Sequence, residues 1–160
     1  MEYITTYASP MGTLWLTSDG EALTGLWIDM PTGNGAANEN RPIFEAAFRW
    51  LDAYFRGENP PMDALPLSPS GTEFQKLIWE ILLTIPFGCT RSYGDIAKEA
   101  AARMGRNKMS AQAVGGAVGR NPISIIIPCH RVIGANGQLT GYAGGLSKKA
   151  WLLRHEEEHK

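Results

Sequence analysis

The sequence predicts an α+β protein with two lobes, and three observations support this prediction. Short β-prone runs separated by turn signals occupy the first 28 residues, and one amphipathic helical pattern follows them. A proline-rich connector comes next, and helical patterns dominate the rest. We therefore expect a small antiparallel-sheet-plus-helix lobe over residues 1–71. Residues 72–160 should form a mainly helical, winged-helix-like lobe with a helix-turn-helix.

Turn signals divide the first 28 residues into three β-prone runs. Pro10-Met11-Gly12 and Asp19-Gly20 favour turns, so the runs should pair as an antiparallel meander. Apolar side chains then recur at helical spacing over residues 42–56, which predicts a helix on one face of the sheet. No cluster of chemistry-bearing side chains occurs here, so we expect a scaffold. The β-prone runs are residues 3–8, 13–17 and 23–28.

The second lobe consists mainly of helical patterns with residues that can cap them. Residues 57–71 contain four prolines and are typical of an extended connector. An apolar stripe then predicts a helix over residues 73–85, and capping residues predict helices over 93–103 and 111–119. A basic turn joins the last two, which suggests a helix-turn-helix. The expected N-caps are Thr72, Ser92, Ser110 and, for a final helix, Ser147.

The charge of the chain is distributed unevenly. Net charge is −1, but residues 1–85 contain four Lys or Arg and eleven acidic residues. Residues 86–154 contain ten Lys or Arg and two acidic residues. This asymmetry indicates a polyanionic partner such as nucleic acid for the second lobe. The alternative is a solvated basic face that docks on the acidic lobe.

Several classes of protein are not indicated by the sequence. The chain has 160 residues with 44% hydrophobic and 19% charged residues, which is typical of a globular protein. It shows no signal-peptide pattern and no apolar stretch near the roughly 20 residues of a membrane helix. Two cysteines, Cys89 and Cys129, are too few for a disulfide scaffold, so a reduced, cytoplasmic protein is expected. No ligand spacing indicates a metal site.

Residues 121–131 contain the most specific chemical signal. Four isoleucines between two prolines fit a buried strand or a buried helical turn. Cys129 and His130 stand where this apolar run ends, beside Arg131. A thiol has a reference pKa of about 8.5, and a neighbouring base or cation raises its thiolate fraction. Adjacent strand residues point to opposite faces, so the pair cooperates only if Pro128 turns the chain or a water lies between. The alternative is a buried cysteine beside a surface histidine.

The helix expected at residues 111–119 is unusually slim. It contains Gly115 and Gly116, and each glycine costs roughly 1 kcal/mol relative to alanine in a helix interior. Only Gln112 is long and polar, which disfavours base reading in a major groove. A slim helix suits the minor groove, where one side chain can enter the base stack. Close helix packing inside the protein is the alternative.

A glycine-rich segment follows the Cys-His pair. Residues 134–145 contain five glycines around Tyr142. Such a loop can wrap closely around a flat ligand, with Tyr142 as one wall. The alternative is an ordinary tight turn with a packed tyrosine.

These residues together resemble the O6-alkylguanine-DNA alkyltransferases, the methylated-DNA–protein-cysteine methyltransferase family. The resemblance covers about residues 72–156, and the Pro-Cys-His-Arg segment in this setting is highly specific. The residues that carry it are Asn121-Pro122, Pro128-Cys129-His130-Arg131-Val132-Ile133-Gly134, Ala113-Val114-Gly115-Gly116, Ser92-Tyr93, Gly141-Tyr142-Ala143-Gly144-Gly145 and Trp151-Leu152-Leu153-Arg154-His155-Glu156.

The resemblance implies direct-reversal DNA repair. Cys129 would take the alkyl group from O6-alkylguanine in double-stranded DNA and keep it as a thioether, once per chain; O4-alkylthymine is an alternative substrate. His130 would act through a water, with Glu156 holding the imidazole as in a catalytic triad. Asn121 would hold the turn beneath the site, and Tyr93 would help to protonate the guanine. By pattern alone, Glu156 would more often belong to a solvated acidic helix end.

Base flipping is implied because a buried thiol does not reach O6 inside an intact duplex. The family usually places an intercalating arginine where this chain has Gln112, which lacks the planar charge. We therefore expect weaker DNA affinity or slower flipping, with the chemistry intact. The residues expected to contact DNA or the flipped base are Ser92, Gln112, Ala113, Gly115, Gly116, Arg120, Arg131, Val132, Tyr142, Ala143 and Gly144.

The resemblance implies no cofactor, no metal, no membrane partner and a monomeric methylated-DNA–[protein]-cysteine S-methyltransferase. Two other functions are weighed against it. The Gln112 departure is compatible with a module that binds alkylated DNA without transfer. The Cys-His pair alone is compatible with a hydrolase, although that chemistry needs an oxyanion site that the sequence does not indicate.

Overall fold

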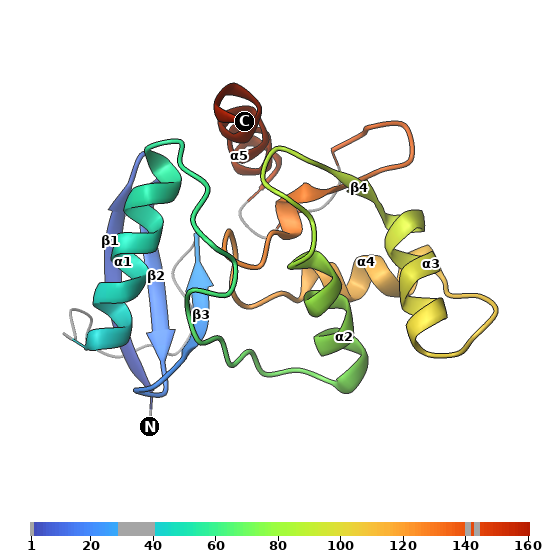
Figure 1. Ribbon diagram of the computed structural model, residues 1–160, viewed down its shortest axis with the longest axis horizontal. Coiled ribbons are helices and arrows are strands. Elements are labelled where there is room, and N and C mark those ends of the chain that lie inside the picture. The colour runs from blue at the N-terminus through green and yellow to red at the C-terminus, as the bar shows by residue number, and fades with distance from the viewer. Residues whose placement is uncertain (1, 29–40, 140–141, 143–144) are drawn as a thin grey trace.

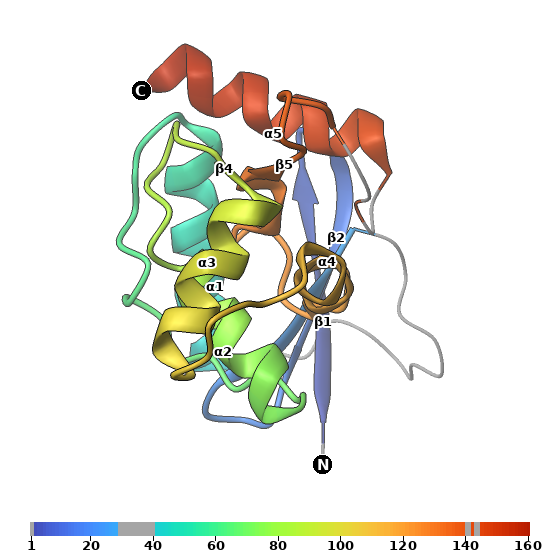
Figure 2. The ribbon, with the colours of Figure 1, turned by 90° about the vertical axis from the view of Figure 1, so that its right-hand side faces the viewer.

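The computed structural model describes residues 2–28, 41–139, 142 and 145–160. A sheet-and-helix lobe and a helical lobe lie side by side (Figure 1). A long C-terminal helix runs along one end of the molecule (Figure 2). The predicted α+β class and its order of elements are confirmed.

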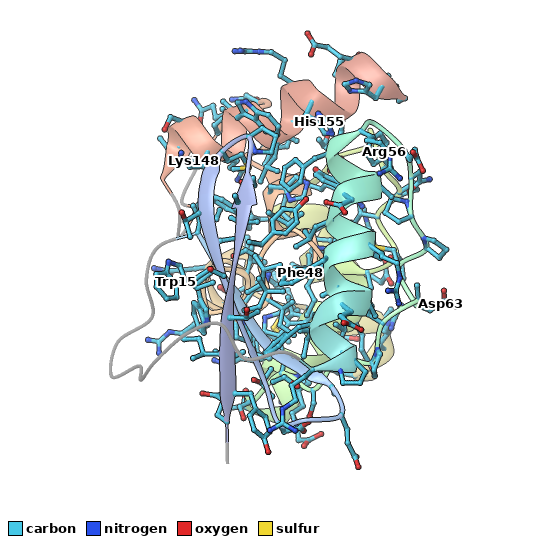
Figure 3. All side chains as sticks on the ribbon, turned by 90° about the vertical axis from the view of Figure 1, so that its left-hand side faces the viewer. Trp15, Phe48, Arg56, Asp63, Lys148 and His155 are labelled. Atoms are coloured by element: carbon cyan, nitrogen blue, oxygen red, sulfur yellow. The ribbon has the colours of Figure 1, made fainter. Side chains whose placement is uncertain are left out.

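The first lobe is a three-stranded antiparallel meander covered by one helix. Strands β1 (Tyr3–Ser9), β2 (Gly12–Ser18) and β3 (Leu23–Trp27) pair in sequence order. Helix α1 (Pro42–Phe55) buries an apolar stripe against the sheet. Phe48 lies between α1 and the sheet, 5.6 Å from the ring of Tyr7, and Trp15 projects on the other side of the sheet (Figure 3). The predicted meander and its covering helix are therefore confirmed.

The second lobe follows the predicted helices closely. It contains α2 (Glu73–Leu82), α3 (Tyr93–Arg103) and α4 (Ala111–Gly119), with the basic turn between the last two. The side chains of Thr72, Ser92 and Ser110 accept hydrogen bonds from the backbone three residues on, so these three caps are confirmed. The Trp79 indole donates to the Ala117 carbonyl at 2.9 Å and ties α2 to α4.

The last helix begins two residues earlier than expected. Helix α5 (Leu146–His159) has Gly145 as its N-cap, with φ of 94°, so the prediction that Ser147 caps it is wrong. This backbone angle favours glycine, and Ser147 lies inside the first turn. Two side chains tie α5 to the first lobe (Figure 3): Lys148 donates to the Met11 carbonyl at 2.7 Å, and His155 contacts the Tyr54 carbonyl at 2.7 Å.

The isoleucine-rich segment is neither a regular strand nor a helix. Ile123 forms an isolated bridge with Leu26 of β3, and Ile125 has a φ of 71°, which breaks any extended run. The Asn121 side chain donates to the Ile127 carbonyl at 2.9 Å and accepts from the Ile123 amide at 3.0 Å. A side chain that competes for backbone groups in this way favours a turn. The β-branched run therefore contributes buried apolar side chains but does not form a regular β-strand.

Within the described part of the chain, no helix is long and apolar enough to cross a membrane.

Candidate active site

Cys129 and His130 lie on one tight turn. Pro128 has φ of −80° and ψ of 64° and leads into the 3-10 turn η1 (Cys129–Arg131). The Cys129 amide donates to the Ile127 carbonyl at 2.7 Å, and the Arg131 amide donates to the Pro128 carbonyl at 3.0 Å. The chain therefore turns at Pro128, which meets the geometric condition set by the sequence. His130 is fully buried, so the alternative of a surface histidine is wrong.

A short parallel pairing places the start of α3 beside this turn. Strand β4 (Arg91–Ser92) pairs with β5 (Val132–Ile133), which directly follows η1. Tyr93 is the first residue of α3 and directly follows β4, so this pairing places it near the end of β5. Strands of two residues leave no periodic signal in a sequence, so this contact could not be predicted.

The Glu156 carboxylate is the centre of a buried hydrogen-bond cluster. Its Oε2 lies 2.6 Å from His130 Nε2 and accepts from the Tyr54 hydroxyl at 2.6 Å and from Arg131 Nη2 at 3.0 Å. Its Oε1 accepts from Arg131 Nε at 2.8 Å and from the Gly88 amide at 3.1 Å. Burial acts to raise the pKa of Glu156, but the hydrogen bonds and charges of His130 and Arg131 hold it well below its usual range. Glu156 is therefore an ionised carboxylate and not a solvated helix end.

His130 is held as a neutral imidazole. Burial lowers its pKa, and this outweighs the opposite effect of Glu156. Because Nε2 faces the carboxylate, we assign the proton to Nε2, which leaves the lone pair on Nδ1. Nδ1 is buried and has no hydrogen-bond partner among the described residues. Buried polar atoms are normally satisfied by protein or water, so Nδ1 is suited to bind a bridging water.

Cys129 is a resting thiol, with 6% of its surface exposed. Burial raises its pKa to about 11, although a hydrogen bond from Asn121 and the charge of Lys149 act in the opposite direction. The effect of the neighbouring cation is therefore present, as expected, but burial outweighs it. A base must remove the proton before the sulfur can react.

Lys149 is a buried cation that the sequence did not single out. It lies on α5, and its Nζ donates to the Val132 carbonyl at 2.6 Å, while burial lowers its pKa. Lys149 precedes Glu156 by seven residues, which is two helical turns and places both on one face. That spacing was the signal that could have identified it.

Arg131 is not available to DNA. The residue is 1% exposed, and its guanidinium donates to both oxygens of Glu156 and, from Nη1, to the Ile85 carbonyl at 2.6 Å. The prediction that it contacts DNA is therefore wrong, because its donors are engaged inside the protein. Val132 is also buried, and Tyr142 and Ser92 are half-buried. Burial holds the pKa of Tyr142 well above its usual range, so its phenol stays protonated. Ala143 and Gly144 lie outside the described residues.

The glycines of α4 are not explained by packing inside the protein. A Cβ added to Gly116 would meet no described atom within 4 Å, and one added to Gly115 would meet only the Tyr93 ring, at 3.9 Å. Gly116 is exposed, as are Gln112, Ala113 and Arg120 at the C-cap, whereas Gly115, which was also expected to contact DNA, is half-buried. This face is left open to another molecule.

Comparisons with known proteins identify the family. Residues 3–69 match the family model of the 6-O-methylguanine DNA methyltransferase ribonuclease-like domain, and residues 73–158 match that of its DNA-binding domain. A Methanosarcina acetivorans protein named methylated-DNA–protein-cysteine methyltransferase is 46% identical, covering 96% of this chain and 97% of its own length. A Mycobacterium leprae protein of the same name is 50% identical over 93% of this chain and 88% of its own.

A solved structure extends the similarity to the fold. The crystal structure of Mycobacterium tuberculosis OGT in complex with DNA superposes with a TM-score of 0.86 at 44% identity, covering 98% of this chain and 94% of that one. This chain belongs to the 6-O-methylguanine DNA methyltransferase family.

Proposed function

We propose that this protein repairs DNA by moving an alkyl group from O6 of guanine to Cys129, once and irreversibly. The single observation that supports this most directly is the arrangement around the thiol. Cys129 shares one buried turn with His130, whose Nε2 lies 2.6 Å from the ionised Glu156. The names of the relatives, methylated-DNA–protein-cysteine methyltransferase, describe the same reaction.

The first step is removal of the thiol proton. A thiol with a pKa of about 11 is protonated at neutral pH, so a base is required. His130 would accept the proton at Nδ1 through a bridging water, and the resulting imidazolium would be stabilised by Glu156. Asn121 would hold the turn, and the Lys149 charge would favour the thiolate.

The second step is displacement at the alkyl carbon. The Cys129 sulfur forms a bond to that carbon while the carbon–O6 bond breaks, and the electron pair of that bond passes to the guanine. The guanine takes up one proton, which balances the one lost by the thiol. Tyr93 would assist this protonation, because β4 pairs with β5 and brings the start of α3 to the site. The thioether on Cys129 has no route back to a thiol, so each chain reacts once.

Double-stranded DNA would lie against the exposed face of α4. The open space at Gly116 supports close approach of a groove, and Arg120 adds charge at the end of the helix. Gln112 would enter the base stack in place of the usual arginine. The flipped base would be bounded by Tyr142 and by the backbone near Val132, Ala143 and Gly144. Every group of the proposed relay belongs to one chain, which supports action as a monomer.

The division into lobes and the location belong to the same proposal. We place a scaffold domain at residues 1–71 and the DNA-binding and transfer domain at residues 72–160. A cytoplasmic location is supported by the chemistry, because transfer needs a reduced Cys129 and both cysteines of the chain are free.

Intact-mass measurement tests the proposal. The protein is mixed with a duplex that contains O6-methylguanine, and we expect at most one methyl group per chain, located on Cys129 and absent in Cys129→Ala. Binding without a gain in mass would favour the module that binds without transfer. Continuous turnover of an ester substrate would favour the hydrolase.

A further inference from the structure

Tyr54 reaches the centre of the transfer site from the other lobe. It lies in the last turn of α1, is fully buried and donates its hydroxyl proton to Glu156 Oε2 at 2.6 Å, across 102 residues of sequence. The same oxygen lies 2.6 Å from His130 Nε2. One carboxylate oxygen is therefore shared between the first lobe and the histidine.

The position of this hydroxyl is fixed by packing. The Tyr54 ring stacks on Trp50 with centroids 5.7 Å apart, and Phe87 meets it edge-on at 5.8 Å. Its backbone carbonyl contacts His155 Nε2 at 2.7 Å, which anchors the end of α1 to α5. Burial, followed by the negative charge of Glu156, raises the pKa of Tyr54 well above its usual range. The phenol therefore remains a donor at every pH at which the protein works.

A donor in this place affects both the orientation and the basicity of the carboxylate. Charge-assisted hydrogen bonds are stronger than neutral ones and constrain geometry. The Tyr54 hydroxyl withdraws negative charge from Oε2, so the ionised form of Glu156 is favoured. Without this hydrogen bond, more negative charge remains on Oε2 beside His130, so the imidazolium form of His130 is stabilised further.

We propose that Tyr54 is a positioning residue for alkyl transfer, which fixes the Glu156 carboxylate that in turn holds His130. This inference rests on the proposed function. It gives the first lobe a part in orienting the general base His130, although the sequence indicated only a scaffold there.

The test is Tyr54→Phe, which keeps the ring and removes the hydroxyl. The rate constant for methyl transfer to Cys129 is measured under single-turnover conditions from pH 5 to 9. We expect a loss of about tenfold near neutral pH, because a carboxylate that has lost this donor orients His130 less well, and this outweighs the gain in imidazole basicity. The pKa values of Glu156 and of the His130 imidazolium both rise, so the acidic limb of the profile moves to higher pH by roughly one unit.

Tyr7→Phe is the matched control. Tyr7 also donates its hydroxyl to a carboxylate at 2.6 Å, Asp52, and lies in the same lobe. This pair has no contact with Glu156, so we expect the native rate and the native pH profile. Thermal unfolding of both variants measures any general loss of stability. A native rate and profile for Tyr54→Phe would overturn the inference. So would a lower rate with an unmoved acidic limb, because that indicates a purely structural role.

A second readout separates failure of the inference from failure of the proposed function. The chain has three histidines, so the titration of the His130 imidazole can be followed by NMR without any transfer. We expect Tyr54→Phe to raise the pKa of His130 and Tyr7→Phe to leave it unchanged. If the native protein transfers no methyl group but this shift occurs, the proposed function fails and the inferred coupling stands. An unmoved His130 contradicts the coupling whatever the transfer result.

Discussion

The buried cluster around Glu156 and the exposed face of α4 differ in burial and in packing, although we assign both to the same reaction. Around Glu156, the hydrogen-bond partners lie 2.6 to 3.1 Å from the carboxylate oxygens, and the groups come from α1, α5 and η1 as well as the Gly88 amide. On α4 the side chains are small, Gly116 has open space around it, and Gln112 is exposed. The polar groups of the cluster are hydrogen-bonded within the protein, whereas the face of α4 has open space for a partner.

This difference indicates where the protein tolerates change. A buried charge cluster is stable only as a whole, because removal of one partner leaves another charge unpaired in a low dielectric. An exposed face with little internal packing can change without affecting folding. Substitutions in the cluster should therefore alter stability and chemistry together, whereas substitutions on α4 should separate DNA binding from stability.

Glu156→Ala should have the largest effect on stability. It leaves the Arg131 guanidinium buried without its carboxylate, which costs about 3–5 kcal/mol. Because Glu156 has a lowered pKa in the folded state, its contribution is present above its unfolded pKa of about 4.3 and is lost as the pH falls below that value. Urea unfolding from pH 7 to pH 3 measures this. The difference in free energy of unfolding between the native protein and the variant should become smaller as the pH falls.

Glu157→Ala is the control for this comparison. Glu157 pairs with Lys160 at 2.9 Å, and the two side chains are 65% and 50% exposed. Exposed pairs contribute at most about 1 kcal/mol, so the variant should unfold close to the native midpoint. Equal losses in the two variants would contradict a special role for the buried cluster.

Gln112→Arg should have the next largest effect. It should change DNA binding and transfer but not the stability of the protein. An arginine at this exposed position can stack on bases and pair with phosphate, which we expect to speed transfer on methylated duplex about tenfold, or about 1.4 kcal/mol. Gln112→Lys adds the charge without the planar group. If stacking matters, Lys should steepen the salt dependence of binding as Arg does but accelerate transfer less. Unchanged or slower transfer by Gln112→Arg would contradict our interpretation of this departure from the family.

The two regions also differ in how far the sequence predicted them. Ser92 and Ser110 followed local capping rules, and the structure shows both caps. Cys129 and His130 stood out because the residues around them are specific. Their assigned roles stay predictions, as does the division at residue 71.

The interactions that could not be predicted are those between distant segments. Tyr54 lies 102 residues from Glu156, and no periodicity joins an α1 residue to an α5 carboxylate. The isoleucine run suggested a strand because β-branched residues favour strands, but the Asn121 side chain takes the backbone groups that a strand would need. Arg131 was expected at the DNA from the family resemblance, and only the fold shows that a buried carboxylate binds it.

Gly116→Ala should have the smallest effect. It should raise the free energy of unfolding and lower the affinity for DNA. A methyl group at Gly116 meets no described atom within 4 Å, so folding should gain about 0.5–1 kcal/mol from the higher helix propensity of alanine. The same methyl group projects from the face that we assign to DNA, so affinity for methylated duplex should fall. Thermal unfolding and DNA titration of one preparation measure both properties. A gain in stability with unchanged affinity would show that DNA does not approach this helix closely, and the open space on α4 would then need another explanation.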